Sequence, residues 1–248
     1  MSSTREDVNI LQPLLDNHLA FISTHRGRVR FGSGAIDVAG DEDFLSCWIP
    51  TGENASVPGA AHTVRTVPWS GPGWPERLHA EGLEPAEVLL YMEMPLRSHI
   101  PACAPGDVIE VASPAEALAF AAAQGGGFLE QDDVRNAWWR ATFERMALKN
   151  YSHPNQFFYL MRAEGIAAAV TLAVRTKGVF GIYAVATRPE FRGRGFASTL
   201  LARAQHDARQ RGGERLTLQV AEGSYAERLY RKLGFTLAFR SPAYRRSC

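Results

Sequence analysis

Residues 186–204, ATRPEFRGRGFASTLLARA, place a turn rich in glycine and arginine between an apolar segment and an amphipathic helix. The first amides of a helix lack partners within the helix and carry partial positive charge. Glycine permits unusual backbone dihedral angles and lets a ligand approach closely. The stretch therefore predicts a binding site for an anion, most often a phosphate or a pyrophosphate.

Two familiar phosphate-binding patterns do not fit this turn. Ser198 occupies the place of the third glycine in the dinucleotide pattern Gly-x-Gly-x-x-Gly. That pattern also follows a strand of a parallel sheet, whereas the segments before residue 188 are joined by turns too short for a parallel pair. The Lys-Ser/Thr pair of a P-loop is absent from the turn.

The segments from residue 107 onward predict the elements of one mixed sheet. Ser113, Pro114 and Glu116 form the pattern of a capped helix start, and Gly125–Gly127 are expected to end that helix. Short turns between three apolar segments predict an antiparallel meander. The predicted order is strand 107–112, helix 114–124, a helix after Asp133, strands 155–163, 165–176 and 177–187, helix 195–211, strand 214–220, helix 224–234 and strand 235–240.

Residues 1–100 differ in character, with many prolines, glycines and single aromatic residues. Prolines and glycines mark the expected starts and ends of elements in this part. The predictions are a short helix in 9–22 broken near Pro13, a helical turn from Pro75 to Gly82, a strand at 88–96, a linker at 101–106, and domains 1–100 and 107–248.

The composition is that of a soluble globular protein, with 46% apolar and 21% charged residues among 248. The formal net charge of +1 gives no overall attraction to nucleic acid or anionic lipid, so neither partner is expected. The wide spacing of Cys47, Cys103 and Cys248 predicts neither a disulfide framework nor a metal site. The sequence shows neither a membrane span nor a signal pattern, so a cytoplasmic location is expected.

Two segments carry a resemblance to a known family. The first, YAVATRPEFRGRGFASTLLARA (183–204), resembles the acetyl-coenzyme A motif of the GNAT family of N-acetyltransferases, in which Arg/Gln-x-x-Gly-x-Gly/Ala opens a helix after an apolar strand. The second, LTLQVAEGSYAERLYRKLGF (216–235), looks like the second motif of that family. The matching residues are Arg192, Gly195 and Ala197 in the first motif, and Ala226, Leu229, Tyr230, Gly234 and Phe235 in the second.

The resemblance covers about 107–240 and implies an α+β fold, the GNAT acetyltransferase fold, with a mainly antiparallel central sheet flanked by helices. A smaller α/β domain is expected to precede it. Residues 1–100 bear a weaker likeness to a degenerate half-domain found ahead of the catalytic domain in some members, and the alternative is an unrelated extension.

The resemblance also implies roles for particular residues, with acetyl-CoA as the acyl donor. The backbone amides of Arg192, Gly193, Arg194, Gly195, Phe196 and Ala197 would bind the pyrophosphate. The backbone of Val185 and Thr187 would pair with the pantetheine arm. Tyr230 would protonate the departing thiolate, since a phenol with a pKa near 10 is protonated at neutral pH. Ser224 stands beside Gly223, which occupies the place of a family asparagine, and is a candidate contact.

The acceptor side of the site is less specified. Tyr183 is expected to share a strand face with Val185 and Thr187, so Tyr183 and Trp138 are candidate substrate contacts. No spacing selects a general base among Glu130, Asp132, Asp133, His153 and Glu222. The acceptor is expected to be a primary amine of a small molecule or a peptide, and the protein a monomer or a homodimer.

Two other classes of function stay open. A non-catalytic acyl-CoA-binding or sensing protein would keep the fold without a base. A nucleic-acid-binding protein would use the arginines around the turn, but the near-zero net charge and the lack of interleaved aromatic residues disfavour it.

Overall fold

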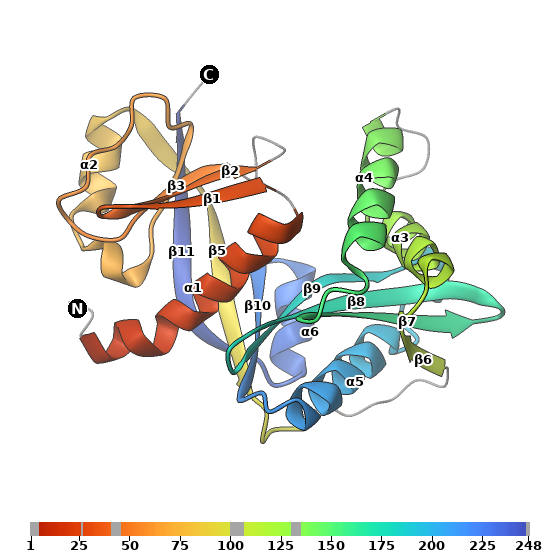
Figure 1. The fold of residues 1–248 in the computed structure, drawn as a ribbon. Coiled ribbons are helices and arrows are strands. Elements are labelled where there is room, and N and C mark those ends of the chain that lie inside the picture. Colours follow the sequence, from red (N-terminus) through yellow and green to blue (C-terminus); the bar gives the residue numbers. More distant parts are fainter. Residues whose placement is uncertain (1–4, 26, 41–45, 100–106, 130–134, 247–248) are drawn as a thin grey trace. The chain divides into compact units, whose positions relative to one another are not determined.

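The computed structural model describes residues 5–25, 27–40, 46–99, 107–129 and 135–246 (Figure 1). Two compact units divide the chain: Met1–Glu93 with Thr217–Cys248, and Met94–Leu216. The first unit is therefore assembled from two stretches that are far apart in the sequence. The predicted linker at 101–106 lies outside the described residues, and the division into domains 1–100 and 107–248 stays a prediction.

Strands of the first unit follow the order β1-β2-β3-β4-β11-β5-β10. Neighbours pair antiparallel in β1–β2, β2–β3, β4–β11 and β5–β11, whereas β3 and β4 run parallel. The bounds are β1 Gly27–Gly32, β2 Ala35–Gly40, β3 Cys47–Pro50, β4 Thr63–Arg65, β5 Leu83–Pro95, β10 Arg215–Ala221 and β11 Thr236–Arg246.

The helices of the first unit are α1 (Arg5–His25), α2 (Trp74–Ala80) and α6 (Tyr225–Lys232), with the 3-10 turn η2 at Pro68–Ser70. The predicted break near Pro13 is wrong, because α1 continues through it. A proline inside a helix removes one hydrogen bond and strains the preceding turn. Leu14 and Leu15 directly after it are fully buried, and this packing offsets the local cost.

An apolar cluster and a polar network share the interior of the first unit. Trp48 and Trp74 pack edge to face, with ring centroids 5.7 Å apart. His18 Nδ1 lies 2.8 Å from the Tyr91 hydroxyl. Burial, helped by the charge of Arg65, lowers the pKa of His18 to about 3, so this imidazole is neutral in the folded protein.

Arg65 connects several polar groups of the same unit. Its guanidinium donates to the Ser241 carbonyl at 2.9 Å and to Glu87 Oε1 at 2.9 Å. Glu87 also pairs with Arg245 at 2.7 Å. Because the Arg65 side chain is only 11% exposed, its charge is held by protein groups more than by water.

The second unit contains an antiparallel sheet in the order β9-β8-β7-β6. Its strands are β6 (Asp107–Glu110), β7 (Gln156–Ala163), β8 (Ile166–Thr176) and β9 (Val179–Thr187). Its helices are α3 (Pro114–Phe128), α4 (Arg135–Asn150) and α5 (Phe196–Gln210), with the 3-10 turn η3 at Pro189–Phe191. The predicted meander and the mixed, mostly antiparallel fold class are confirmed.

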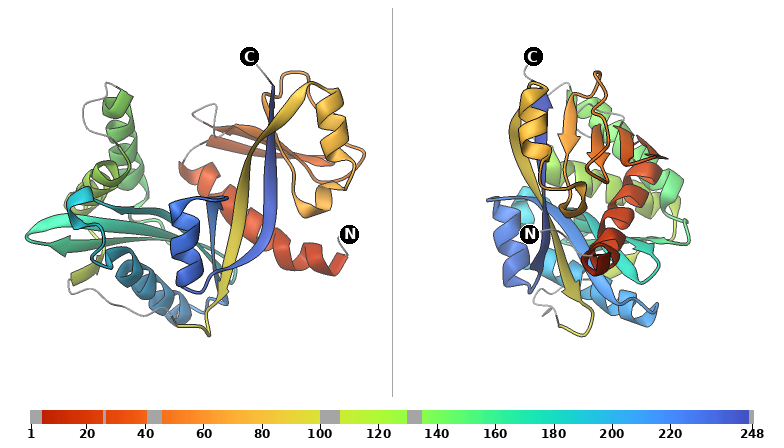
Figure 2. Two further views of the ribbon diagram at one scale, coloured as in Figure 1. Left: turned by 180° about the vertical axis from the view of Figure 1, so that it is seen from behind. Right: turned by 90° about the vertical axis from the view of Figure 1, so that its left-hand side faces the viewer.

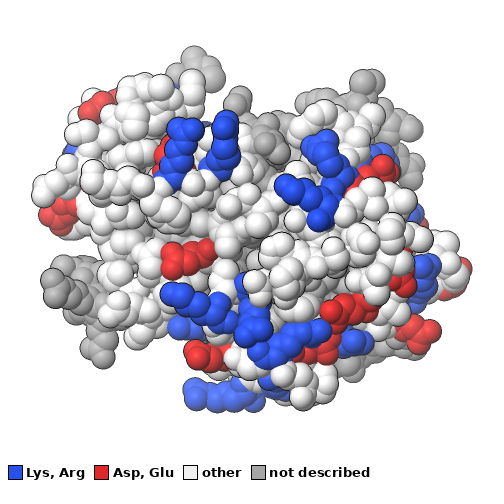
Figure 3. All heavy atoms as spheres, in the orientation of Figure 1, with Lys and Arg blue, Asp and Glu red and all other residues white. Residues whose placement is uncertain are grey.

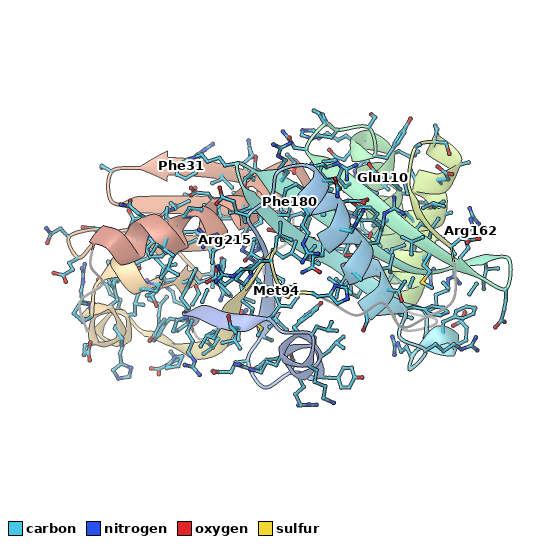
Figure 4. The ribbon with its side chains drawn as sticks, turned by 90° about the horizontal axis from the view of Figure 1, so that it is seen from below. Phe31, Met94, Glu110, Arg162, Phe180 and Arg215 are labelled. Atoms are coloured by element: carbon cyan, nitrogen blue, oxygen red, sulfur yellow. The ribbon has the colours of Figure 1, made fainter. Side chains whose placement is uncertain are left out.

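Helices cover both faces of this sheet (Figures 1 and 2). Phe120 of α3 packs on Phe158, with centroids 5.0 Å apart, whereas the Arg203 guanidinium of α5 lies 5.9 Å from the neighbouring Tyr159 ring. Successive strand residues point to opposite faces, so α3 and α5 lie on opposite sides. Glu110 of β6, labelled in Figure 4, accepts from Arg211 Nη2 at 2.9 Å, which fixes the end of α5.

Helix α3 begins as predicted and ends later than predicted. The Ser113 hydroxyl accepts a hydrogen bond from the Glu116 amide at 3.3 Å, which confirms the cap. The helix does not stop at Gly125 but continues to Phe128. A Cβ placed on Gly127 would lie 2.9 Å from Ala186 Cβ, so the glycines serve close packing of helix on strand and not helix termination.

Candidate functional site

Strand β9 carries a bulge near its end. Leu172 lies opposite Tyr183 and Val170 opposite Ala186, so Thr171 faces two residues, 184 and 185. Ala184 has a φ of 51°, in the left-handed region that non-glycine residues rarely adopt. The extra residue shifts the alternation of side chains.

The bulge corrects one expectation about side-chain direction. Tyr183 and Ala186 face partners two residues apart on β8, and therefore share a face of the sheet. Tyr183 consequently does not share a face with Thr187 as simple alternation predicts. The predicted contact between Tyr183 and a substrate stays a prediction.

A glycine loop connects β9 to α5. Gly193 and Gly195 have φ values of 75° and 79°, where residues with a Cβ are strained. The rings of Phe191 and Phe196 stack with centroids 5.9 Å apart and close the loop on itself. No side chain caps α5 at its N-cap residue, Gly195. The amides of the first turn are therefore left to water or to a ligand.

The arginines of the loop are held by the protein. Arg192 donates from Nε to the Thr187 carbonyl at 3.2 Å and from Nη2 to the Gly127 carbonyl at 2.9 Å. Arg194 pairs with Glu164 at 2.8 Å. These bonds leave the guanidinium groups of Arg192 and Arg194 committed to protein partners.

A cavity of about 600 Å³ opens beside this loop. Arg194 and Phe196 line one side of it, and Arg162, labelled in Figure 4, lines another. The turn 163–165 and Asp107 complete its wall. The cavity is in the range of volumes that small-molecule sites occupy, and it lies next to the first turn of α5.

Helix α6 and its N-cap residue contain the other predicted site residues. The Ser224 hydroxyl accepts from the Glu227 amide at 3.1 Å, and Glu227 Oε2 accepts from the Gly223 amide at 2.7 Å, so this end of the helix is capped. Tyr230 is 8% exposed and packs edge to face on Phe235, with centroids 5.8 Å apart. Burial raises the pKa of the Tyr230 phenol to about 12.

Residues 126–235 match the model of the acetyltransferase (GNAT) family. This part of the chain belongs to the GNAT family. The matched span begins in the last turn of α3 and includes the bulge, the glycine loop and α6. The predicted family is therefore confirmed.

Solved structures of similar fold extend beyond the GNAT span. A GCN5-related N-acetyltransferase from Kribbella flavida is 18% identical with a TM-score of 0.64, and the match covers 99% of this chain and 96% of that one. A functionally unknown conserved protein from Staphylococcus epidermidis is 9% identical with a TM-score of 0.61, covering 88% and 93%. A GCN5-related N-acetyltransferase from Sphaerobacter thermophilus is 21% identical with a TM-score of 0.55, covering 77% and 61%.

At these identities the structural likeness shows the fold alone. No curated protein matches the chain in sequence. The family match places residues 126–235 in an acetyltransferase family, and it fixes neither the donor, nor the acceptor, nor the roles of single residues.

The predicted GNAT site residues fall in both compact units. Trp138, Tyr183 and the segment 185–197 belong to the unit Met94–Leu216, and Ser224 and Tyr230 to the other. Trp138 is 44% exposed on α4 and packs edge to face on Trp139, with centroids 4.9 Å apart. Its role as a substrate contact stays a prediction.

The candidate bases have ordinary surroundings where the structure describes them. His153 Nδ1 accepts from the Asn155 amide at 3.1 Å, and Glu222 pairs with Arg240 at 2.8 Å. Glu130, Asp132 and Asp133 lie outside the described residues. Within the described ranges, no cluster of three or more metal-ligating side chains occurs.

The surface charge and the helices can be compared with two expectations from the sequence, that the protein binds no nucleic acid and spans no membrane. On the face drawn in Figure 3, basic residues gather in the lower half, with acidic residues beside them. No helix in the described part of the chain is long and apolar enough to cross a membrane.

A second cavity, of about 610 Å³, lies in the first unit and is separate from the motif residues of 183–204. Strands β2, β3 and β11 line it, and the Cys47 side chain contributes to its wall. Burial raises the pKa of the Cys47 thiol to about 11, despite the opposing charge of Arg65. A thiol with so high a pKa is a poor nucleophile at neutral pH.

Sequence reasoning missed three structural features of the GNAT domain. The bulge at Ala184 depends on the register with β8, which no local pattern reveals. The approach of Gly127 to β9 and the bonds of Arg192 to it join segments about 60 residues apart. The run of three glycines within a helical pattern was the one available signal, because such a run is costly unless packing requires it.

Proposed function

We propose that the protein transfers an acetyl group from acetyl-CoA to a primary amine by direct attack. The observation that carries this proposal is the uncapped start of α5, preceded by Gly193 and Gly195 in left-handed conformations. A helix start of this kind offers backbone donors and partial positive charge to a pyrophosphate. The amides of Arg192–Ala197 are assigned to that role.

Strand β9 is assigned to the pantetheine arm of the coenzyme. An extended ligand with amide groups pairs with strand backbone as an added strand does. Val185 and Thr187, both half-buried at the end of β9, would supply these backbone groups. The bulge at Ala184 supports this assignment, since bulges increase local twist and often lie beside active sites.

Tyr230 is assigned as the general acid. The amine nitrogen attacks the thioester carbonyl carbon, the carbon–sulfur bond breaks, and the thiolate takes the phenol proton while a base removes the proton of the amine. With its pKa raised by burial to about 12, the Tyr230 phenol is protonated over the whole neutral range and has a proton to donate. No base is assigned.

Coenzyme binding and thiol release test the proposal. Acetyl-CoA should raise the melting temperature by mass action, and free thiol should appear when amines of several classes are added. Stabilisation without thiol release from any amine would favour an acyl-CoA-binding sensor. The absence of any stabilisation would overturn both coenzyme-dependent functions. The predicted cytoplasmic location and the monomer or homodimer stay predictions.

Replacement of the proposed acid separates chemistry from binding. Tyr230→Phe should lower kcat by about 100-fold, because general acid catalysis contributes factors of this order. The Kd for acetyl-CoA should stay within about threefold of the wild-type value, because the ring and its packing on Phe235 are kept. An unchanged kcat would refute the acid role.

A further inference from the structure

Three arginine side chains from separate segments contact the last turn of α3. A Cβ placed on Gly125 would lie 3.7 Å from Arg140 Cγ of α4, and one on Gly126 would lie 3.3 Å from Arg188 Cγ and 3.4 Å from its Cζ. Arg192 Nη2 donates to the Gly127 carbonyl at 2.9 Å. Successive Cα atoms are about 3.8 Å apart, so the three arginines contact neighbouring residues of one tripeptide.

This convergence requires the glycines. A side chain at residue 126 would press on Arg188, and one at residue 127 would lie 3.0 Å from the Thr187 amide. The helix end therefore fits against the end of β9 and leaves room for the arginines at the same time. Helix propensity alone disfavours three glycines here, which indicates that the close approach is the purpose of the run.

Among the described residues, the ion pairs leave the positive charge at this point without a carboxylate partner. Arg194, Arg203 and Arg211 of the same unit each pair with a carboxylate at 2.8 to 2.9 Å. In the described ranges, Arg140 and Arg188 form no ion pair, and Arg192 bonds only to neutral carbonyls. The C-terminal end of α3 supplies only partial negative charge, about half an elementary charge.

Arg188 has a buried hydrogen-bond donor without an acceptor. Its Nε is fully buried and has no hydrogen-bond partner among the described residues. A buried donor without a partner is costly, and such groups in native proteins often mark the place of a water, an ion or a ligand. Guanidinium groups favour planar or tetrahedral oxyanions, which accept paired hydrogen bonds.

We propose that Arg140, Arg188 and Arg192 form an anion subsite at the C-terminal end of α3, which takes a carboxylate or phosphate group. The subsite uses the side chain of Arg192, whereas the cradle at the start of α5 uses its backbone amide. The role of the subsite in catalysis rests on the proposed function. The reason is that the end of α3 adjoins Thr187, which is assigned to the pantetheine arm of the coenzyme. The anionic group belongs either to the acceptor, as the carboxylate of an amino acid, or to the coenzyme, as one of its phosphates.

Binding of inorganic phosphate tests the subsite without any turnover. The variants are Arg140→Gln with Arg188→Gln together, and Arg145→Gln as the matched control, since Arg145 lies on the same helix and donates to Thr142. Phosphate should raise the melting temperature of the wild type and of the control alike. The double variant should need at least fivefold more phosphate for the same rise. Equal phosphate dependence in all three proteins would overturn the subsite.

Two further measurements identify the molecule to which the anionic group belongs. The first compares kcat/KM for amines with and without a carboxylate, such as phenylalanine against 2-phenylethylamine and glycine against methylamine. An acceptor carboxylate predicts a preference of at least tenfold for the acids, which the double variant loses. The second measures the Kd for CoA, and a coenzyme phosphate predicts at least a tenfold weakening in the double variant.

The outcomes separate the subsite from the proposed function. Wild-type protein that neither binds CoA nor releases thiol refutes the proposed function, while the phosphate measurement still decides the subsite. Wild-type protein that is active, with a double variant unchanged in acid preference, CoA affinity and phosphate dependence, refutes the subsite and leaves the function standing. The melting temperature in buffer alone reports whether the double variant is folded.

Discussion

Strands β3 and β9 are followed by very different connections. Residues 51–62 after β3 contain turns and no helix, and they lead into β4, which runs parallel to β3. Residues 188–195 after β9 form a glycine loop that opens α5. Only the second connection presents a row of helix amides to an anion. The comparison indicates that the helix start, more than the strand before it, suits the pyrophosphate that we propose binds here.

The arginines of the two regions also differ in how far their ion pairs are exposed to water. Around β4, Arg65 is bound by Glu87 and by a backbone carbonyl inside the protein. Around the glycine loop, Arg194 is exposed and its pair with Glu164 is half in water. The first arrangement serves stability, and the second leaves groups at the surface where a ligand can reach them.

The largest expected effect concerns His18 and acid. Its folded-state pKa of about 3 lies below the ordinary value of 6.5, so the unfolded chain binds a proton that the folded one excludes. The lowered pKa of His18 contributes roughly 4 kcal/mol to the free energy of unfolding. This contribution is fully present above pH 6.5 and is lost as the pH falls toward 3. The free energy of unfolding, measured with urea between pH 7 and pH 4, should fall more steeply with decreasing pH in the wild type than in His18→Gln. Parallel curves would contradict this assignment.

A smaller loss of stability is expected when the bonds of Arg65 are removed. Arg65→Met removes the bonds to Glu87 and to the Ser241 carbonyl, while Glu87 keeps its pair with Arg245. The free energy of unfolding should fall by roughly 2–3 kcal/mol, less than for a fully buried pair because Glu87 is 39% exposed. The Kd for acetyl-CoA should stay the same. A large change in that Kd would break the contrast between the two regions.

Two matched glycines test the loop directly. Gly193 and Gly212 have φ values of 75° and 73°, and a Cβ on either would meet nothing within 4 Å. Replacement by alanine should therefore destabilise the protein similarly, by about 1–2 kcal/mol. Only Gly193→Ala should raise the Kd for acetyl-CoA, by about tenfold, because its methyl group would stand among the amides of the cradle. Equal Kd values for the two variants would argue against the cradle.

The smallest effect is expected for a side chain of the loop. Arg194→Ala removes an ion pair whose side chains are 49% and 67% exposed. The free energy of unfolding should change by less than about 1 kcal/mol, and titration calorimetry should show a Kd for acetyl-CoA within about threefold of wild type. A loss of tenfold or more would assign the pyrophosphate to side chains and not to backbone.

Features with a local cause were predictable from the sequence. The cap at Ser113 depends on residues three positions apart, and the meander of β7, β8 and β9 follows from short turns. The start of α5 after Gly195 follows from glycine and the helical period. These signals lie within a few residues of the structure that they determine.

Features with a distant cause were not predictable. Strand β11 continues to Arg246, past the predicted end at residue 240, because it pairs with both β4 and β5. The bulge at Ala184 exists only in register with Thr171. Of the candidate site, the glycine loop was visible in the sequence, whereas the arginines at the end of α3 come together only through tertiary packing.

The place of β11 between β4 and β5 has a consequence for the order of synthesis. A ribosome releases residues 1–93 long before Thr236–Arg246, so the sheet of the first unit cannot close until nearly all of the described chain has emerged. The nascent protein must hold one edge of β4 and both edges of β5 unpaired while the glycine loop and α5 are made, because β10 and β11 both follow α5. Such edges invite association with other chains, and translation speed or chaperones therefore bear directly on the yield of this protein.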